Sequence, residues 1–250
     1  MGQHCELMAQ HWAIPRDEQD LLAVESHRKL AAAYAEGWQD DLMTPFLGLT
    51  RDQNLRADID LAKLATLKPV FEKGQRGTLT AANSTPLTDG ASLVLLASEE
   101  WAKARGLPIL AYWRDGEAAA VDFVKGDEGL LMAPVYAVPR LLARNGLTLQ
   151  DFDYYEIHEA FAAQVLCTLN AWEDPDYCRT KLGLEQPLGA IDRAKLNVKG
   201  SSLAAGHPFA ATGGRIVANL AKLLSVAGEG RGLISICAAG GQGVTAILER

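Results

Sequence analysis

Three short motifs in the second half of the chain carry side chains that could do chemistry. His158 begins the motif His-Glu-Ala-Phe, His207 lies within a Gly-His-Pro loop, and Cys237 precedes Ala-Ala-Gly-Gly. Imidazole titrates near neutral pH, so a histidine in a fixed loop can carry a proton or donate a hydrogen bond to an oxyanion. The free N–H groups of a turn can donate hydrogen bonds to a developing oxyanion, or they can lower the pKa of an adjacent thiol. Together the motifs indicate proton transfer and thiol chemistry.

Each of these residues, taken singly, also has a purely structural interpretation. Single-residue motifs often match by chance, and His207 could simply fill its loop. Cys237 could be a small buried hydrophobic residue, as most free cysteines are. His158 could hold a water or a carbonyl group, or be only a polar residue at a helix start, where Glu159 would compensate the helix dipole. Because their spacing does not fit a metal site, we expect no bound metal.

The glycines that follow Cys237 do not form a nucleotide-binding loop. Such a loop needs a helix directly after its glycines, because the helix N-terminus holds the phosphate. Here the strand-like run 244–248 follows them. The turn therefore joins two strands, which we expect to pair in antiparallel fashion.

The three motifs lie at the ends of elements that the hydrophobic pattern predicts. One predicted strand directly precedes His158 and another ends at Cys237, and a predicted buried helix follows the loop of His207. Because the helix at 214–227 has few polar residues on any face, we expect it to be deeply buried. The predicted strands are 109–113, 153–157, 233–237 and 244–248, and the predicted helices of this half are 135–145, 159–172 and 214–227.

The first hundred residues contain one long helix and much irregular chain. Residues 14–38 have the proline, the acidic first turn and the apolar periodicity of an amphipathic helix. Taken with the second half, this pattern predicts an α/β protein. The remaining segments are an irregular polar stretch at 39–77, a short strand at 78–80, turn formers at 83–90, an apolar run at 91–97 and a helix at 99–105.

Composition indicates a globular protein. A chain of 250 residues with 48% hydrophobic and 22% charged residues can bury a sizeable core. Its net charge of −7 argues against a nucleic-acid binder. No apolar run approaches the roughly 20 residues of a membrane span, and we expect no signal peptide. The four cysteines lack CxxC spacing, so we expect neither a zinc site nor disulfides, and a reducing cytoplasm as the location.

The order and spacing of the motifs resemble the thiolase family, the enzymes that make or cleave 3-ketoacyl-CoA. His158 and His207 are 49 residues apart (158 to 207), and Cys237 follows 30 residues later (207 to 237). The resemblance extends to the turn at 83–90, to Thr66-Leu67-Lys68-Pro69, and to the 14–38 helix, which is similar to the family's lid. It covers nearly the whole chain, but only the second half or so of a full thiolase.

The resemblance implies a thiolase fold, layered αβαβα, with its N-terminal core domain largely missing. Residues 1–77 would then be part of the lid and loop domain. Residues 78–106 would be the last segment of the N-terminal domain, and residues 107–250 would be the C-terminal domain.

The resemblance also implies catalytic roles. Cys237 would be the acid/base cysteine that moves the α-proton of an acyl-CoA. His207 would activate the nucleophilic cysteine and help to bind the thioester oxygen. Most biosynthetic thiolases have asparagine where His158 stands, holding a water in the first oxyanion hole. Histidine there is similar to the thiolase subunit of the fatty-acid β-oxidation multienzyme complex, which favours longer 3-ketoacyl substrates.

By the same resemblance, coenzyme A esters are the substrates and no cofactor is needed. Thr85, Ala160 and Phe161 match positions that line the channel for the pantetheine arm of CoA. Ala239 and Gly240 belong to the turn of the second oxyanion hole, where many members carry glycine in place of Ala239. The implied partners are acyl-CoA and CoA, further copies of the chain, and a β-oxidation hydratase/dehydrogenase subunit.

The chain departs from the family at the nucleophile. That cysteine lies in a Cys-x-Ser-Gly segment at a helix start, a context that Cys5, Cys167 and Cys178 lack. We therefore expect a C-terminal fragment, or a subunit whose other half comes from a second polypeptide, that is inactive in thiolysis by itself.

Two other functions remain open from the sequence. A non-catalytic thiolase-like protein could bind acyl-CoA or lipid, and its binding would not depend on Cys237 or His207. A decarboxylating ketoacyl synthase shares the architecture but uses two histidines opposite its nucleophile, so the cysteine in the last loop argues against it.

Overall fold

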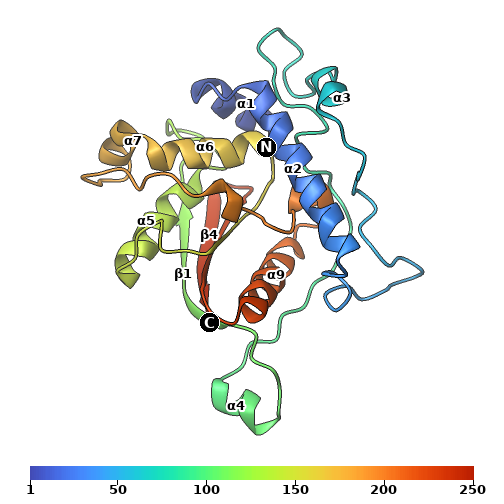
Figure 1. The fold of residues 1–250 in the computed structure, drawn as a ribbon. Helices are drawn as coiled ribbons and strands as arrows, with labels where there is room; N and C mark the ends of the chain where they lie inside the picture. Colours follow the sequence, from blue (N-terminus) through green and yellow to red (C-terminus); the bar gives the residue numbers. More distant parts are fainter.

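The computed structural model describes residues 1–250, and one four-stranded sheet lies at its centre (Figure 1). Its strands, in the spatial order β1-β4-β3-β2, are β1 (Tyr112–Ala120), β2 (Tyr154–Ile157), β3 (Arg231–Ala238) and β4 (Gln242–Glu249). Strands β2 and β3 are parallel, whereas β4 is antiparallel to both β3 and β1. The predicted antiparallel pair is confirmed: Cys237 lies opposite Gly243, in a hairpin whose turn contains Gly240 and Gly241 at positive φ.

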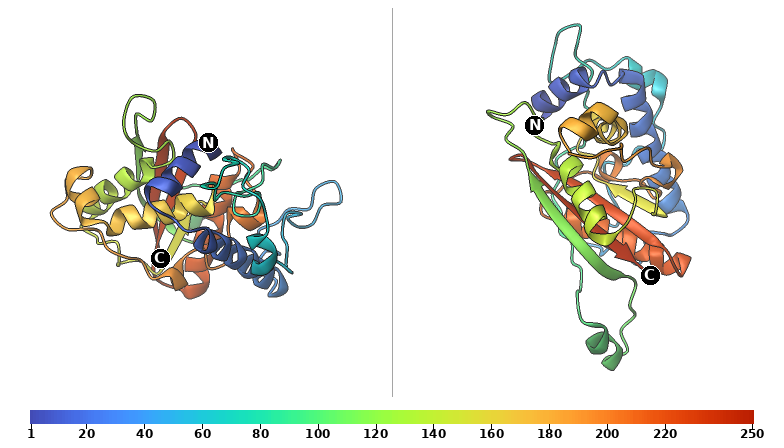
Figure 2. Two further views of the ribbon diagram at one scale, coloured as in Figure 1. Left: turned by 90° about the horizontal axis from the view of Figure 1, so that it is seen from above. Right: turned by 90° about the vertical axis from the view of Figure 1, so that its left-hand side faces the viewer.

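Helices cover both faces of this sheet (Figures 1 and 2). Helices α5 (Ala133–Asn145) and α6 (Ala162–Glu173) lie on one face, and α9 (Thr212–Ala227) lies on the other. Side chains of a strand alternate between the two faces of a sheet. Strand β3 therefore contributes Leu233 and Cys237 to the main core with α5 and α6, and Ile234 to the smaller core with α9. This alternation places the Cys237 thiol on the α5–α6 side.

The N-terminal helices α1 (Gly2–His11) and α2 (Arg16–Ala35) pack against α6, and α2 also packs against α8 (Ser202–Ala205). Gly200 allows the chain before α8 to approach α2 closely. Its φ is +77°, and a Cβ there would lie 2.5 Å from the carbonyl oxygen of Ser26 and 2.7 Å from the Cβ of Leu30. A glycine is therefore required at this crossing.

We expect Gly200→Ala to lower the free energy of unfolding by at least about 2 kcal/mol, because a left-handed backbone costs about 1–2 kcal/mol and overpacking adds about 1–3 kcal/mol. Urea unfolding followed by circular dichroism measures the loss. Gly146→Ala is the matched control, because Gly146 has a φ of +64° but nothing within 4 Å of its added Cβ. Equal losses in the two variants would contradict the importance of the close approach.

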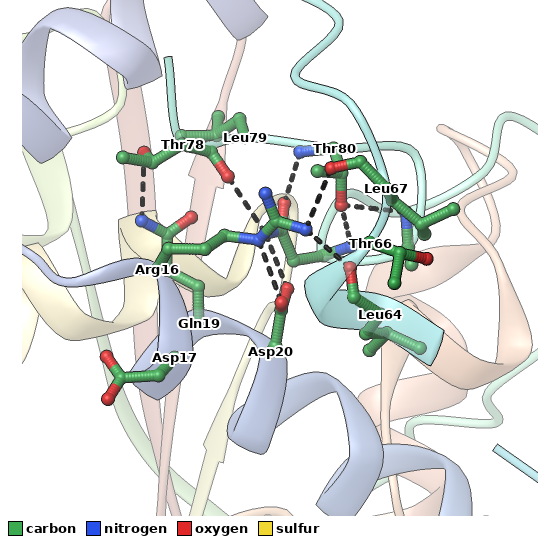
Figure 3. Close-up of polar contacts among 12 residues, drawn as sticks. Arg16, Asp17, Gln19, Asp20, Leu64, Thr66, Leu67, Thr78, Leu79 and Thr80 are labelled. Atoms are coloured by element: carbon green, nitrogen blue, oxygen red, sulfur yellow. Dashed lines mark hydrogen bonds and ion pairs between the residues drawn. The ribbon is translucent and has the colours of Figure 1, made fainter. Parts of the chain in front are cut away.

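A polar network joins α2 to the chain between positions 64 and 83 (Figure 3). The Arg16 guanidinium donates to Asp20 (2.8 Å) and to the carbonyl oxygen of Leu64 (2.6 Å). The other carboxylate oxygen of Asp20 accepts from the side-chain amide of Asn83 (3.0 Å). The strand predicted at 78–80 is wrong, since that segment is held by side chains of the N-terminal helices and joins no sheet.

Most of the other predicted elements are confirmed, with ends shifted by a few residues. The helix predicted at 14–38 is α2, the helix at 99–105 is α4 (Glu99–Ala104), and the strand at 153–157 is β2. Gly146 ends α5 in the left-handed conformation, as a glycine after a predicted helix indicates. Helices α1, α3 (Leu61–Ala65), α7 (Pro175–Thr180), α8 and the 3₁₀ helix Arg193–Lys195 were not predicted from the sequence.

Two further predictions are wrong for identifiable physical reasons. The strand expected at 109–113 is β1, which begins only at residue 112 and runs on through polar sequence. Asp115 and Glu117 of this edge strand form ion pairs with Arg144 of α5, and those pairs hold polar sequence against the helix. Helix α9 is buried on one face only, because the sheet covers one side and leaves Val226, for example, 68% exposed.

The apolar run at 91–97 is extended and exposed. Leu93 is 90% exposed, and Leu95 and Leu96 are 68% and 70% exposed. The run belongs to no strand of the sheet and leads into α4, which stands away from the body of the molecule (Figures 1 and 2). Exposed apolar surface with unpaired backbone favours association with another chain.

Candidate active site

His158 directly follows β2, and backbone hydrogen bonds fix its position. Its N–H donates to the carbonyl oxygen of Ser235 in β3 (2.9 Å). The side-chain amide of Asn197 holds the preceding residue, Ile157, at both backbone groups: it donates to the carbonyl oxygen and accepts from the N–H, each at 2.9 Å. The His158 imidazole is therefore held rigidly at the carboxyl end of β2, where it is fully enclosed.

His207 meets His158 from a separate loop. Gly206 has a φ of +98°, a conformation that favours glycine, and turns the chain out of α8. The N–H of His207 donates to the carbonyl oxygen of Pro86 (3.0 Å), and its Nδ1 lies 2.6 Å from the hydroxyl oxygen of Thr212. The centroids of the two imidazole rings are 4.2 Å apart. The structure thus brings together two histidines that are 49 positions apart in the chain.

Cys237 lies at the same end of the sheet. Ile157 of β2 pairs in parallel with Ser235 of β3. His158 and Cys237 therefore both lie at the carboxyl ends of these two neighbouring strands. They line one small internal cavity together with Ser235 and Gln164. Burial raises the pKa of Cys237 to about 12. The glycine-rich turn therefore does not lower the pKa of the thiol in this chain, and Cys237 is a neutral thiol at pH 7.

Three of the predicted substrate-binding residues also meet near the histidines. The N–H of Thr85 donates to the carbonyl oxygen of Ala160 (3.1 Å), and the residue before Thr85 forms a backbone bridge with Phe161. The Thr85 hydroxyl donates to the carbonyl oxygen of Ser202 (2.5 Å). Ala239 and Gly240 lie in the exposed turn that follows Cys237.

Glu159 does not compensate a helix dipole, because α6 begins only at Ala162 and Glu159 is fully buried before it. Its carboxylate accepts three hydrogen bonds: from the hydroxyl of Ser26 (2.7 Å), the amide of Asn197 (2.8 Å) and the backbone N–H of Leu203 (3.0 Å). The predicted role was wrong because these partners come from parts of the chain remote in sequence. Glu159, in the loop after β2, thus connects that loop to α2, to α8 and to the segment that contains Asn197.

A second buried carboxyl belongs to Glu156 of β2, two positions before His158. It accepts a hydrogen bond from the side-chain amide of Asn219 in α9 (2.8 Å), whose oxygen accepts from the indole N–H of Trp38 (2.9 Å). Burial raises the pKa of Glu156 to about 8, against the opposing field of Arg215. Neither Glu156 nor Arg215 was predicted from the sequence; the position of Arg215 as a lone arginine at the start of an apolar helix was the only signal for it.

We expect Glu156→Gln to stabilise the protein progressively as the pH rises from about 4.5 to 8. The folded state retains the Glu156 proton to a higher pH than the unfolded chain, so the wild type loses stability across this window. Glutamine keeps the acceptor for Asn219 and cannot ionise. The difference in the free energy of unfolding between variant and wild type should grow by at most about 1.4 kcal/mol per pH unit. Urea unfolding at several pH values measures it, with exposed Glu173→Gln as control; parallel profiles would contradict the prediction.

Both imidazoles are neutral at pH 7. Burial lowers the pKa of His158 well below its usual value, and the neighbouring His207 and Arg215 lower it further. Burial and Arg215 also lower the pKa of His207. Neutral imidazoles can accept a proton at one nitrogen while donating a hydrogen bond from the other. The site therefore combines the Cys237 thiol with two neutral imidazoles, whose nitrogens can accept a proton or donate a hydrogen bond.

No group of three or more histidine, cysteine, aspartate or glutamate side chains is arranged to hold a metal ion. The helices include none with the length and apolar character needed to cross a bilayer. The fold and the site define an α/β protein with two paired imidazoles and a buried thiol at one end of its sheet, an arrangement suited to thiol-dependent acyl transfer.

Comparison with known proteins agrees with this class. The model of the thiolase N-terminal domain matches residues 1–100, and that of the thiolase C-terminal domain matches residues 107–250. The 3-ketoacyl-CoA thiolase of Yersinia pestis (strain Pestoides F) is 45% identical over 255 aligned residues, which cover all of this chain and 58% of the relative. The chain belongs to the thiolase family.

Solved structures agree on the fold. The Bacillus anthracis acetyl-CoA acetyltransferase superimposes with a TM-score of 0.82 at 35% identity, and human mitochondrial 3-ketoacyl-CoA thiolase with a TM-score of 0.81 at 30% identity. Each comparison covers all of this chain and 59% of the other. The protein has the thiolase fold, and it spans somewhat more than half the length of the relatives it matches.

Proposed function

We propose that these residues form the C-terminal domain, part of the lid and part of the active site of an acyl-CoA acyltransferase, a 3-ketoacyl-CoA thiolase. The reaction would be thiolytic cleavage of a 3-ketoacyl-CoA to acetyl-CoA and a shortened acyl-CoA, or the reverse Claisen condensation. The observation that carries the proposal is the meeting of His158, His207 and Cys237 at one end of the sheet. The names of the similar proteins support the choice of substrate.

His207 is suited to activate a thiol. The Thr212 hydroxyl donates to the carbonyl oxygen of Pro208 (3.1 Å), so its oxygen is free to accept from Nδ1 of His207. That arrangement leaves Nε2 of His207 without a proton, ready to accept one from a nucleophilic cysteine. His158 would bind the thioester oxygen.

Cys237 would move the proton of the acyl-CoA α-carbon. In cleavage, the thiolate of the nucleophilic cysteine bonds to the β-carbon and keeps the shortened acyl group, which the incoming CoA thiol later takes. The bond between the α- and β-carbons breaks, and its electron pair stays on acetyl-CoA as the enolate. The Cys237 thiol then gives its proton to that carbon and becomes a thiolate. A proton from the incoming CoA thiol restores it. In this scheme Thr85, Ala160 and Phe161 line the pantetheine channel, and Ala239 and Gly240 supply backbone N–H groups to the second oxyanion hole.

The nucleophilic cysteine of this scheme is none of the other three cysteines described here. Cys5, Cys167 and Cys178 are all buried in the structure, and burial raises the pKa of each thiol. A thiol of this kind is inert as a nucleophile. We infer that the 250 residues alone do not catalyse thiolysis, and that the nucleophile comes from another stretch of polypeptide.

The exposed run at 91–97 is the surface that the remaining thiolase core would cover. Pairing its backbone with a neighbouring strand would bury Leu93, Leu95 and Leu96, whose present exposure is unfavourable. Further copies of the chain and a β-oxidation hydratase/dehydrogenase subunit are proposed as additional partners, on the family likeness alone.

Complementation tests the proposal. This chain is co-expressed with the N-terminal part of a 3-ketoacyl-CoA thiolase that carries the nucleophilic cysteine, giving what is called here the complemented enzyme. We expect CoA-dependent cleavage of acetoacetyl-CoA or a longer 3-ketoacyl-CoA by the pair, and none by either part alone. Cleavage by this chain alone would overturn the inference about the nucleophile. The intact mass of the native gene product shows whether both parts are one polypeptide.

The alternative function is a non-catalytic thiolase-like protein that binds acyl-CoA or lipid. The raised pKa values of all four thiols favour it. It predicts that the chain binds CoA esters equally well when Cys237 or His207 is replaced, and that no complementation restores turnover. Calorimetric titration with acetyl-CoA separates the two functions.

A further inference from the structure

A buried hydroxyl lies between His158 and a buried arginine. The Oγ atom of Ser202, at the start of α8, is 2.8 Å from Nδ1 of His158. The same oxygen accepts a hydrogen bond from Nη2 of Arg215 in α9, also at 2.8 Å. Ser202 is completely buried and has no other side-chain hydrogen-bond partner. These three residues form a short chain of hydrogen bonds that ends on the imidazole.

The direction of each bond in this chain follows from the chemistry of the groups. A guanidinium only donates, so the Ser202 oxygen must accept from Arg215. The hydroxyl proton then has a single acceptor within reach, which is Nδ1 of His158. In the opposite arrangement, with Nδ1 donating, the hydroxyl proton would be buried without a partner, at a cost of about 1–3 kcal/mol. The Ser202 hydroxyl therefore donates to Nδ1.

This direction fixes where the imidazole carries its proton. Because Nδ1 of His158 accepts, a neutral ring must be protonated at Nε2. That atom is buried and has no hydrogen-bond partner among the residues of the protein. The ring also cannot readily become a cation beside the Arg215 guanidinium. The N–H donor therefore has no acceptor within the protein, and it belongs to a residue that lines the small cavity shared with Cys237.

We propose that Ser202 and Arg215 are positioning residues that hold His158 as the neutral tautomer protonated at Nε2, so that this N–H donates to the carbonyl oxygen of a thioester. The identity of the acceptor rests on the proposed function, whereas the tautomer rests only on the hydrogen bonds. His207 has the opposite tautomer, since its Nδ1 donates to Thr212. The two neighbouring rings, whose planes are tilted by 44°, therefore have different roles: His207 accepts a proton, and His158 donates a hydrogen bond.

Nitrogen NMR of the chain labelled with ¹⁵N-histidine reads the tautomers directly. The chain has five histidines, and a His158→Asn variant assigns the resonances of interest. We expect a protonated Nε2 and an unprotonated Nδ1 at His158, and the reverse at His207. A His158 protonated at Nδ1, or doubly protonated at pH 7, would overturn the proposal.

Variants test which residues impose the tautomer. In Arg215→Met the Ser202 oxygen is free to accept from Nδ1, so both tautomers of His158 should appear. Lys222→Met is the matched control: Lys222 is a cation of the same helix that bonds to Trp38 and Asp41 instead. Ser202→Ala should shift the Nδ1 resonance of His158 to that of a nitrogen without a hydrogen bond, whereas Ser202→Thr should retain it. An unchanged His158 spectrum in Arg215→Met would contradict the role of Arg215.

The acceptor is tested separately with acetyl-CoA bound to the complemented enzyme. The carbonyl stretching frequency of the bound thioester should fall relative to free acetyl-CoA, and fall less in Ser202→Ala than in Ser202→Thr. Equal frequencies in these two variants would contradict donation by His158 to the thioester. If acetyl-CoA does not bind, the proposed function fails, while the tautomers measured on the chain alone still decide the assignment of Ser202 and Arg215.

Discussion

Replacing Cys237 by alanine is expected to slow hydrogen exchange at the α-carbon of acetyl-CoA by about 10²–10⁴-fold in the complemented enzyme, the range that general acid–base catalysis contributes. The thiol is the only titratable side chain of β3 that faces the cavity shared with His158. Alanine removes the thiol that would carry the proton, while its methyl group still occupies the position of the Cys237 Cβ atom. Exchange is measured by NMR of acetyl-CoA in deuterated buffer.

The size of that effect separates a proton carrier from a buried hydrophobic residue. Cys178→Ala serves as the control, because the Cys178 thiol is also buried but packs at α7, where it donates to the carbonyl oxygen of Ala171 (3.4 Å). We expect exchange in this control to stay within about twofold of the wild type, since it touches no proposed catalytic group. Equal exchange in both variants would remove Cys237 from the mechanism and favour the acyl-CoA-binding alternative.

Replacing Glu159 by alanine is expected to lower the free energy of unfolding by about 3–5 kcal/mol, as the loss of a buried charged partner does. The variant removes the acceptor of three buried hydrogen bonds, which are donated by the hydroxyl of Ser26, one amide N–H of Asn197 and the backbone N–H of Leu203. Because Asn197 also clamps the end of β2, His158 should become mobile as well. Urea unfolding gives the free energy, and the His158 NMR resonances report the mobility.

Two controls sharpen the Glu159 experiment. Glu159→Gln keeps the shape and one acceptor oxygen, so its loss should be smaller than that of the alanine variant. Glu185→Ala removes an exposed carboxylate, and we expect a change within about 0.5 kcal/mol. A loss in Glu159→Ala no larger than that in Glu185→Ala would show that the buried hydrogen bonds contribute little.

Short-range signals account for the parts of the fold that were predicted correctly. The strands at 233–237 and 244–248 are largely apolar, the strand at 153–157 is rich in aromatic and β-branched residues, and they appear as β3, β4 and β2. The edge strand β1 was placed wrongly because Asp115 and Glu117 interrupt its apolar pattern. The acidic residues of this strand are held by ion pairs with Arg144, on a helix 27–29 residues later, which no local pattern reveals.

The sequence by itself determined which side chains could do chemistry and at which strand or loop ends they lie. Motifs, turn formers and strand periodicity are properties of short stretches of sequence, so they can be recognised without the structure. The sequence therefore named His158, His207 and Cys237 and indicated the thiolase family. Only the tertiary structure decided their surroundings. Glu159 and Ser26 are 133 residues apart, and Ser202, which links Arg215 to His158, lies 44 positions from His158 and 13 from Arg215. Burial, which raises the pKa of Cys237 and leaves both imidazoles neutral, arises from such distant packing and is invisible in any short stretch of sequence.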